Sequence, residues 1–314
     1  MNTTAVTQTQ RSTLLSGLRA LAARRPIALF LVLVFGSAYP LMALVILAQR
    51  GSIPGATLPA MLGLDMERAA STLMLFGGLL PATLVVTALE GGSPAMRALA
   101  RRIFRWRIGP TWWLIAVAAL PAATIFLAWL MGDSLRMPSA NDLAGELVAG
   151  AIGFLLINLS EEAGWAGFLQ TRLERRHGFL LAGALAAIPF GAIHMPLQVI
   201  NGNTTPGGLA LAFALYLVLG LVVRPLFGMA LRGSGDSVLA AALLHTSFNR
   251  SNNVDGIAAD VLLGSNRQLA ALIATVLVTV VIGLSIRRKL TRAYRQALDA
   301  RNGEEVTPIG SSPR

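Results

Sequence analysis

The chain has 314 residues, of which 54% are hydrophobic and only 13% are charged, and its mean hydropathy is +0.64. Soluble domains average about 25% charged residues, so this composition excludes an ordinary soluble domain and predicts a polytopic membrane protein. The net charge of +11 comes mainly from arginines at the ends of apolar runs, which is typical of membrane topology and not of nucleic-acid binding. Since the chain has no cysteine, disulfides, thiolate nucleophiles and cysteine metal ligands are excluded.

Eight apolar runs follow one another along the chain. Most have about the 20 residues that a helix needs to cross a hydrocarbon core of about 30 Å, whereas the seventh has the length of a buried half-membrane helix. We therefore predict an all-α fold, a polytopic bundle of about eight transmembrane helices. The runs are Pro26–Ala48, Ala69–Leu89, Thr111–Met131, Leu143–Glu162, Phe179–Ile200, Leu209–Leu231, Asp236–Asn249 and Gln268–Ile286.

The arginines fall on alternate connections between these runs, and cytoplasmic connections are enriched in arginine and lysine. The arginine-rich parts are the N-terminus, the segments 97–107 and 172–176, Arg232 and the stretch 287–295. We therefore predict a multi-pass protein of the cell membrane with both termini cytoplasmic. Residues 1–25 form a solvated arm, 26–286 a single transmembrane domain and 287–314 a cytoplasmic tail, which we expect to be disordered from Asp299 onward.

The segment from Arg97 to Arg107 also carries apolar side chains, among them Phe104 and Trp106. A mixture of arginines with aromatic and aliphatic residues is typical of helices that lie along a membrane surface. We expect this segment to lie on the lipid surface.

A few ionisable and amide side chains interrupt the predicted spans. Inserting one charge into hydrocarbon costs roughly 2.5 to 3.5 kcal/mol, so each such group needs a partner or a water-filled cavity. His245 and Asn249 are four residues apart and share one helix face. We predict that these groups surround one site. They are Asn158, Glu161, Glu162, His194, Arg224, His245 and Asn249.

Carboxylates beside imidazoles can activate water for attack on a carbonyl, while histidine and asparagine donors stabilise the oxyanion that forms. This chemistry hydrolyses a peptide without serine, cysteine or metal. The rival chemistry is a zinc site built from two histidines and one glutamate. Because the His-Glu-x-x-His motif of zinc proteases is absent, we predict neither a metal nor another cofactor.

Three ordered motifs resemble those of the CAAX protease and bacteriocin-processing (CPBP, or Abi) family of intramembrane glutamic endopeptidases. The family has a Glu-Glu pair with arginine four positions after the second glutamate, then Phe-x-x-x-His, then His-x-x-x-Asn or Asp. This chain has Glu161-Glu162, Phe190 to His194, and His245 to Asn249. The resemblance covers about residues 111–249.

The resemblance implies a role for each motif residue. Glu161 would activate water, His194 would help to position it, His245 and Asn249 would hold the oxyanion, and Glu162 would support the site. The chain departs from the motif in one place, since Ala166 stands where the family has arginine. We expect Arg224 or Arg172 to pair with Glu162 instead.

The leading hypothesis is an intramembrane endopeptidase that cleaves a membrane-associated polypeptide through a cavity facing the cytoplasm, with CAAX-type processing as one form of it. Its partners would be that polypeptide and the lipid bilayer, with no nucleic acid. Two alternatives stay open. One is a transporter or channel that conducts protons or cations past the buried glutamates and histidines, and the other is a catalytically silent immunity or scaffold protein of the same fold.

Overall fold

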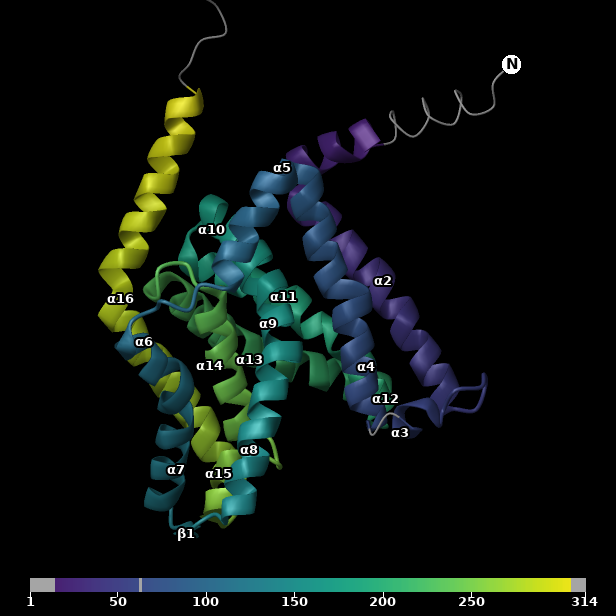
Figure 1. Cartoon of the computed structure of the whole chain (residues 1–314), viewed down its shortest axis with the longest axis vertical. Coiled ribbons are helices and arrows are strands. Elements are labelled where there is room, and N and C mark those ends of the chain that lie inside the picture. The colour runs from purple at the N-terminus through teal and green to yellow at the C-terminus, as the bar shows by residue number, and fades with distance from the viewer. Residues whose placement is uncertain (1–14, 62–63, 306–314) are drawn as a thin grey trace, which may run out of the picture.

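The computed structural model describes residues 15–61 and 64–305, and helices dominate them (Figure 1). Residues 15–24 are helical as well. The further elements are α2 (Pro26–Gln49), α3 (Leu58–Met61), α4 (Met66–Met74), η1 (Leu75–Leu79), α5 (Leu80–Ile103), α6 (Pro110–Leu114), η2 (Ile115–Ala119), α7 (Leu120–Leu130), β1 (Ser134–Leu135), α8 (Ala140–Ile152), η3 (Gly153–Asn158), α9 (Leu159–Glu162), η4 (Ala163–Gln170), α10 (Thr171–His177), α11 (Phe179–Ile193), α12 (Met195–Ile200), α13 (Pro206–Gly233), α14 (Val238–Asn252), α15 (Ile257–Val261), β2 (Leu262–Leu263) and α16 (Arg267–Glu305), where η marks π-helix.

Seven helical spans in the described part of the chain are long and apolar enough to cross a membrane. The one predicted helix that is not among these seven is the seventh in chain order, α14. It has 15 residues and is therefore short, as expected for a buried half-membrane helix. The predicted fold class, a polytopic helical bundle, is confirmed. The spans are Pro26–Gln49, Met66–Ile103, Pro110–Leu130, Ala140–His177, Phe179–Ile200, Pro206–Gly233 and Arg267–Arg288.

Local sequence sets where these helices begin. Pro26 and Pro206 each occupy the first helical position, where the missing N–H of proline costs no hydrogen bond. Ser237 precedes α14, and its Oγ accepts a hydrogen bond from the amide of Ala240 at 3.2 Å. Ser139 and Asp142 form a capping box at the start of α8.

Two predicted boundaries are wrong. The fourth span continues past Glu162 through η4 and α10 to His177, so the two glutamates lie in the interior of a span and not at its end. The second span continues past Leu89 to Ile103, with non-helical backbone at Gly92, where φ is +59°. Both predictions ended the helix where polar or small residues follow an apolar run, but packing against other helices extends it.

The C-terminal prediction is also wrong in part. Helix α16 runs to Glu305, so the residues from Asp299 to Glu305 are helical and not disordered. The helix begins in an apolar span, and once it has formed, each further residue adds a hydrogen bond at low entropic cost. Residues 306–314 and residues 1–14 of the predicted arm lie outside the described residues.

The two sets of connections predicted from the arginine pattern lie at opposite ends of the bundle (Figure 1). The bend of α5, α10 and the upper part of α16 lie at one end. The elements α3, β1 and α15 lie at the other, where β1 and β2 pair antiparallel with Ser134 opposite Leu263. We call the first of these the arginine-rich end.

Helix α14 lies inside the bundle, where it packs against α7, α9, α13 and α16. Small residues allow close approach between spans, as membrane helix packing requires. A Cβ added at Gly220 would lie 2.9 Å from the Cβ of Ala187, so α13 and α11 touch almost backbone to backbone. The buried core includes Phe30, Trp165 and Phe227, and it surrounds α9 with its two glutamates.

Candidate active site

The two glutamates lie on α9, a single turn between two π-helical segments, η3 and η4. A π-helix holds one extra residue per turn, and such segments recur at functional sites because they shift side chains out of the regular helical register. Both side chains are buried, Glu162 completely and Glu161 to 94% (6% exposed). The sequence pattern of this span does not reveal its π-helical segments.

Glu162 pairs with Arg224 of α13, which is one of the two partners expected from the sequence. Arg224 Nη1 lies 2.8 Å from Glu162 Oε1 and 3.1 Å from Oε2, and both side chains are fully buried. The other expected partner, Arg172, pairs with Glu90. Arg224 of α13 thus pairs with Glu162 in this chain, in the place of the family's motif arginine, whose position on the glutamate helix is Ala166 here.

His245 of α14 contacts both carboxylates. Its Nδ1 lies 3.0 Å from Glu162 Oε1 and 3.9 Å from Glu161 Oε2. An ionised carboxylate only accepts hydrogen bonds, so Nδ1 carries the proton of the short contact. The ring also stacks on Phe227 at 4.6 Å between centroids, which together with Glu162 holds its orientation.

Glu161 is held differently from its neighbour. Its Oε1 is buried and has no hydrogen-bond partner among the described residues. A buried carboxylate oxygen without a partner is costly, and functional sites are where such groups persist. The two acids are therefore unequal, as the roughly 100° between adjacent helix positions predicted.

His194 lies at the break between α11 and α12. Its Nδ1 is 2.6 Å from the carbonyl oxygen of Phe190, which makes Nδ1 the donor and leaves Nε2 as an acceptor in the neutral ring. The ring stacks on Tyr216 at 4.9 Å. Phe190 links the two histidines, since its centroid lies 4.8 Å from the ring of His194 and 6.5 Å from that of His245.

Asn249 joins the site through Asn158, which the sequence marked as an intramembrane amide without giving it a role. Asn249 Nδ2 donates to Asn158 Oδ1 at 3.2 Å, and Asn158 Nδ2 donates to Thr246 Oγ1 at 2.8 Å. These bonds tie α14 to the turn before the glutamates. Glu161, Glu162, His245 and Asn249 thus meet around α9. His194 is connected to them through the ring of Phe190, and in the described part of the chain it makes no hydrogen bond to Glu161 or Glu162.

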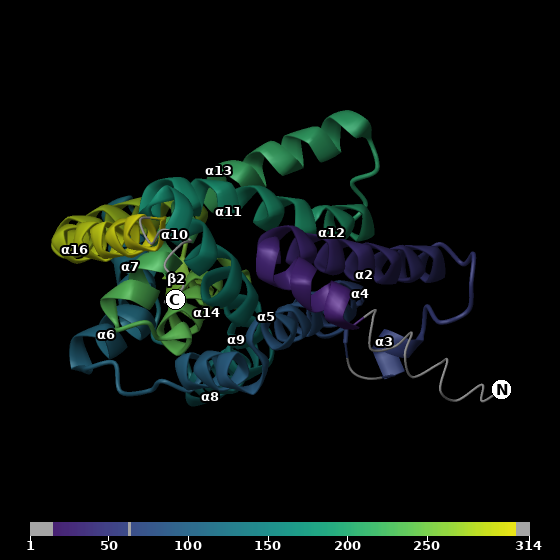
Figure 2. The same ribbon diagram turned by 90° about the horizontal axis from the view of Figure 1, so that it is seen from above.

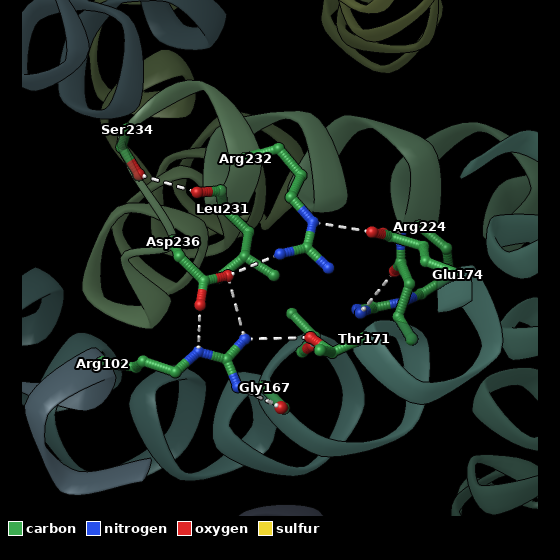
Figure 3. Close-up of polar contacts among 11 residues, drawn as sticks. Arg102, Gly167, Thr171, Glu174, Arg224, Leu231, Arg232, Ser234 and Asp236 are labelled. Carbon is green, nitrogen blue, oxygen red and sulfur yellow. Dashed lines mark hydrogen bonds and ion pairs between the residues drawn. The ribbon is translucent and has the colours of Figure 1, made fainter. Parts of the chain in front are cut away.

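Gln170 and Glu174 also belong to this polar network, although the sequence alone did not single them out. Gln170 Oε1 accepts a hydrogen bond from Arg224 Nη2 at 3.2 Å, and its Nε2 lies 3.4 Å from Glu174 Oε1. Glu174 in turn receives Arg232 Nε at 2.6 Å (Figure 3). The available signal was the spacing of four residues between Gln170 and Glu174, which places them on one face of a helix.

Metal ligation was the rival chemistry for these residues. Within the described ranges, no three histidine, aspartate or glutamate side chains are grouped so that they could hold a metal ion.

Comparison with known proteins gives a match to a protein family. Residues 143–251 match the family described as type II CAAX prenyl endopeptidase Rce1-like, which agrees with the resemblance to the CPBP family. No curated protein and no solved structure matches the chain. The matched segment contains Glu161, Glu162, His194, His245 and Asn249.

Proposed function

On the premise of the Rce1-like match over residues 143–251, we propose that the chain is an intramembrane endopeptidase in which Glu161 activates the attacking water. The observation that carries the proposal is the unpartnered Oε1 of Glu161, buried beside His245 and a fully paired Glu162. One carboxylate is occupied by structural partners, while the other keeps an acceptor for a substrate or water.

In the first step, Glu161 accepts a proton from water while the water oxygen attacks the carbonyl carbon of the scissile peptide bond. His194 supports the same water. Its Nδ1–H is held by the carbonyl of Phe190, so Nε2 serves as the acceptor that orients the second water hydrogen. Stacking on Tyr216 fixes the plane of this ring.

The attack places negative charge on the former carbonyl oxygen. His245 and Asn249 are one helical turn apart on α14 and supply the donors for it. Glu162 orients the His245 ring through Nδ1, which leaves Nε2 as the atom that donates to the oxyanion when it carries a proton. Glu162 is therefore a positioning residue, and Arg224 holds it in place.

The intermediate collapses when the carbon–nitrogen bond breaks. The proton that Glu161 took from water passes to the leaving amine, so Glu161 ends the cycle ionised and ready for the next water. The products are a new amine and a new carboxylic acid, which then loses the second water proton to solvent and becomes a carboxylate. No covalent enzyme intermediate forms.

We place the protein in the cell membrane with both termini cytoplasmic, since the arginine-rich connections share one end of the bundle (Figure 1). The substrate is a membrane-associated polypeptide whose scissile bond reaches α9, which lies within a membrane span. CAAX-type processing is the form of this activity that the matched family suggests.

The test is cleavage of a membrane-anchored reporter peptide by the purified chain, comparing the wild type with Glu161→Ala and His194→Ala, each with and without a chelator. Cleavage that requires Glu161 and survives chelation supports the proposal. Chelator-sensitive cleavage would point to a zinc mechanism instead. Proton flux in sealed vesicles without cleavage would point to transport, and neither activity would point to a silent protein of this fold.

A further inference from the structure

The part of α5 beyond Gly92, together with the loop that follows, forms a basic surface at the arginine-rich end. We call residues 93–107 the surface segment. It bends away from the rest of the second span at Gly92 and runs across this end of the bundle toward α6 (Figures 1 and 2). Four arginines of the segment are exposed and form no ion pair with any described residue; they are Arg97, Arg101, Arg105 and Arg107.

Exposed aromatic rings accompany these arginines. Phe104 is 69% exposed and Trp106 is 60% exposed, and the guanidinium of Arg107 lies 5.2 Å from the centre of the Trp106 ring. Large aromatic rings left in the open beside arginines match the chemistry of a lipid interface, where rings enter the headgroup region and arginines meet phosphates.

Among the side chains that the structure describes, no carboxylate pairs with the four exposed arginines of the surface segment. Three carboxylates at the same end are already paired with arginines of the bundle: Glu90 with Arg172, Glu174 with Arg232, and Asp236 with both Arg102 and Arg232. The exposed charge of the surface segment is therefore positive.

Arg102 points the other way, into the bundle, and clamps η4. Its Nη1 donates to the carbonyl oxygen of Gly167 at 2.7 Å and its Nη2 to Thr171 Oγ1 at 2.9 Å (Figure 3). Thr171 Oγ1 donates in turn to the carbonyl oxygen of Ala166 at 2.8 Å. The irregular hydrogen bonding of a π-helix leaves room for side chains to bind its backbone carbonyls. Here Arg102 and Thr171 bind the carbonyls of Gly167 and Ala166, five and four residues after Glu162.

A second connection runs through side chains. Arg102 Nε pairs with Asp236 Oδ2 at 2.7 Å, and Arg232 bridges Asp236 and Glu174 (Figure 3). From Glu174 the polar contacts continue through Gln170 to Arg224 and end on Glu162. The surface segment thus reaches the glutamates both through the η4 backbone and through a chain of half-buried and buried polar groups.

We propose that the surface segment binds anionic lipid headgroups and that Arg102 couples this binding to the alignment of Glu161 and Glu162. This inference rests on the proposed function for the meaning of that alignment. Anionic headgroups pull the exposed arginines toward the membrane plane, and the position of the segment sets how firmly Arg102 holds η4. Activity should therefore depend on the anionic lipid content of the membrane.

The first test does not require enzymatic activity. Since the chain has no cysteine, Ala100→Cys carries a single environment-sensitive fluorophore on the exposed side of the surface segment. The labelled chain is placed in phosphatidylcholine vesicles with increasing phosphatidylglycerol, and Ser285→Cys on α16 serves as the control label. We expect a blue shift of the label at position 100 as phosphatidylglycerol rises, weakened by salt, and no shift at position 285.

Arginine variants identify the binding groups. Each arginine near an anionic surface contributes roughly a fivefold change in binding. In Arg97→Gln/Arg101→Gln the label response should require much more phosphatidylglycerol or disappear. The matched control Arg287→Gln/Arg288→Gln removes two exposed arginines of α16 and should leave the response unchanged. The proposal that the surface segment binds lipid would be overturned if both variants lost the label response equally, or if inorganic phosphate alone produced the same blue shift.

Hydrogen exchange tests the coupling. Amides of residues 163–170 should exchange more slowly in phosphatidylglycerol vesicles than in neutral ones. Arg102→Gln should keep the label response and lose the slowing of exchange. Arg102→Lys keeps the positive charge but not the planar set of guanidinium donors, so it should retain part of the slowing. Slowing that survives Arg102→Gln would overturn the coupling.

Cleavage then separates the two proposals. The wild type should show a turnover that rises severalfold with phosphatidylglycerol, and Arg97→Gln/Arg101→Gln should keep the activity seen in neutral vesicles but lose the rise. Measurable turnover that does not change with phosphatidylglycerol while the label responds would overturn the coupling. Exchange and label responses without cleavage in any vesicle would defeat the proposed function and leave the lipid coupling standing.

Discussion

At the scale of single residues, the site depends on the difference between two neighbouring carboxylates. Glu162 accepts from Arg224 twice and from His245, whereas Glu161 keeps a buried oxygen without a described partner. Neutralising each acid should therefore have a different consequence. In the proposed mechanism the unpartnered acid activates water, and the paired acid holds the side chains around it in place.

Glu161→Gln should abolish most activity and leave the fold intact. The amide is nearly isosteric but cannot take a proton from water, and loss of a general base costs about 100-fold or more in turnover. Cleavage rate and thermal unfolding of the purified variant check this together. A variant that cleaves at more than a tenth of the wild-type rate would remove Glu161 from the proposed role.

Arg224→Leu should lower stability strongly, because it leaves the Glu162 charge buried and unpaired, at a cost of about 3–5 kcal/mol. The double variant Arg224→Leu/Glu162→Gln should be more stable than Arg224→Leu alone, since it removes the orphaned charge. Denaturant unfolding in detergent of the wild type, Arg224→Leu, Glu162→Gln and the double variant gives the four free energies of this double-mutant cycle. Additive effects would show that the two side chains do not stabilise each other.

At the scale of elements, the helix carrying the glutamates is organised by its π-helical segments and by close packing against α13. Gln170 of η4 lies against Gly228, one turn beyond Arg224. An added Cβ at position 228 would overlap the Gln170 side-chain nitrogen, so glycine there makes room for the amide that holds Arg224. The sequence shows this glycine only as one of many in an apolar helix.

Gly228→Ala should therefore reduce both stability and turnover, by overpacking that typically costs 1–3 kcal/mol and by displacing Gln170 from Arg224. The matched control is Gly36→Ala in α2, where an added Cβ meets nothing within 4 Å. That control should be neutral or slightly stabilising, because alanine favours helix over glycine by up to about 1 kcal/mol. Equal behaviour of the two variants would contradict the packing argument.

At the scale of the whole molecule, the arginine pattern and the bundle agree on two opposite ends. Single cysteines test this directly in a chain that has none. Ser93→Cys near the bend of α5 and Ser52→Cys in the connection after α2 should react with a membrane-impermeant reagent from opposite sides of intact cells or sealed vesicles. Labelling of both from the same side would overturn the proposed orientation.

Much of this molecule followed from sequence because the bilayer restricts the possible structures. A span must be long enough to cross the bilayer, and its lipid-exposed backbone must be helical, so apolar runs locate the helices. The arginines indicate which helix ends lie on the same side of the membrane. For the same reason the rare intramembrane polar residues could be picked out, and three ordered motifs among them indicated the CPBP family. The short seventh helix was predicted from its length alone.

Tertiary structure decided the rest. Which arginine meets Glu162 depends on how α13 packs against η4, since Arg224 is 62 residues away in sequence and Arg172 only ten. The extension of the fourth span through η4, the bridge from Asn249 to Asn158, and the clamp of Arg102 on Gly167 arise between helices that no local pattern brings together. Chain periodicity determines what each helix presents, but only packing determines which side chains meet.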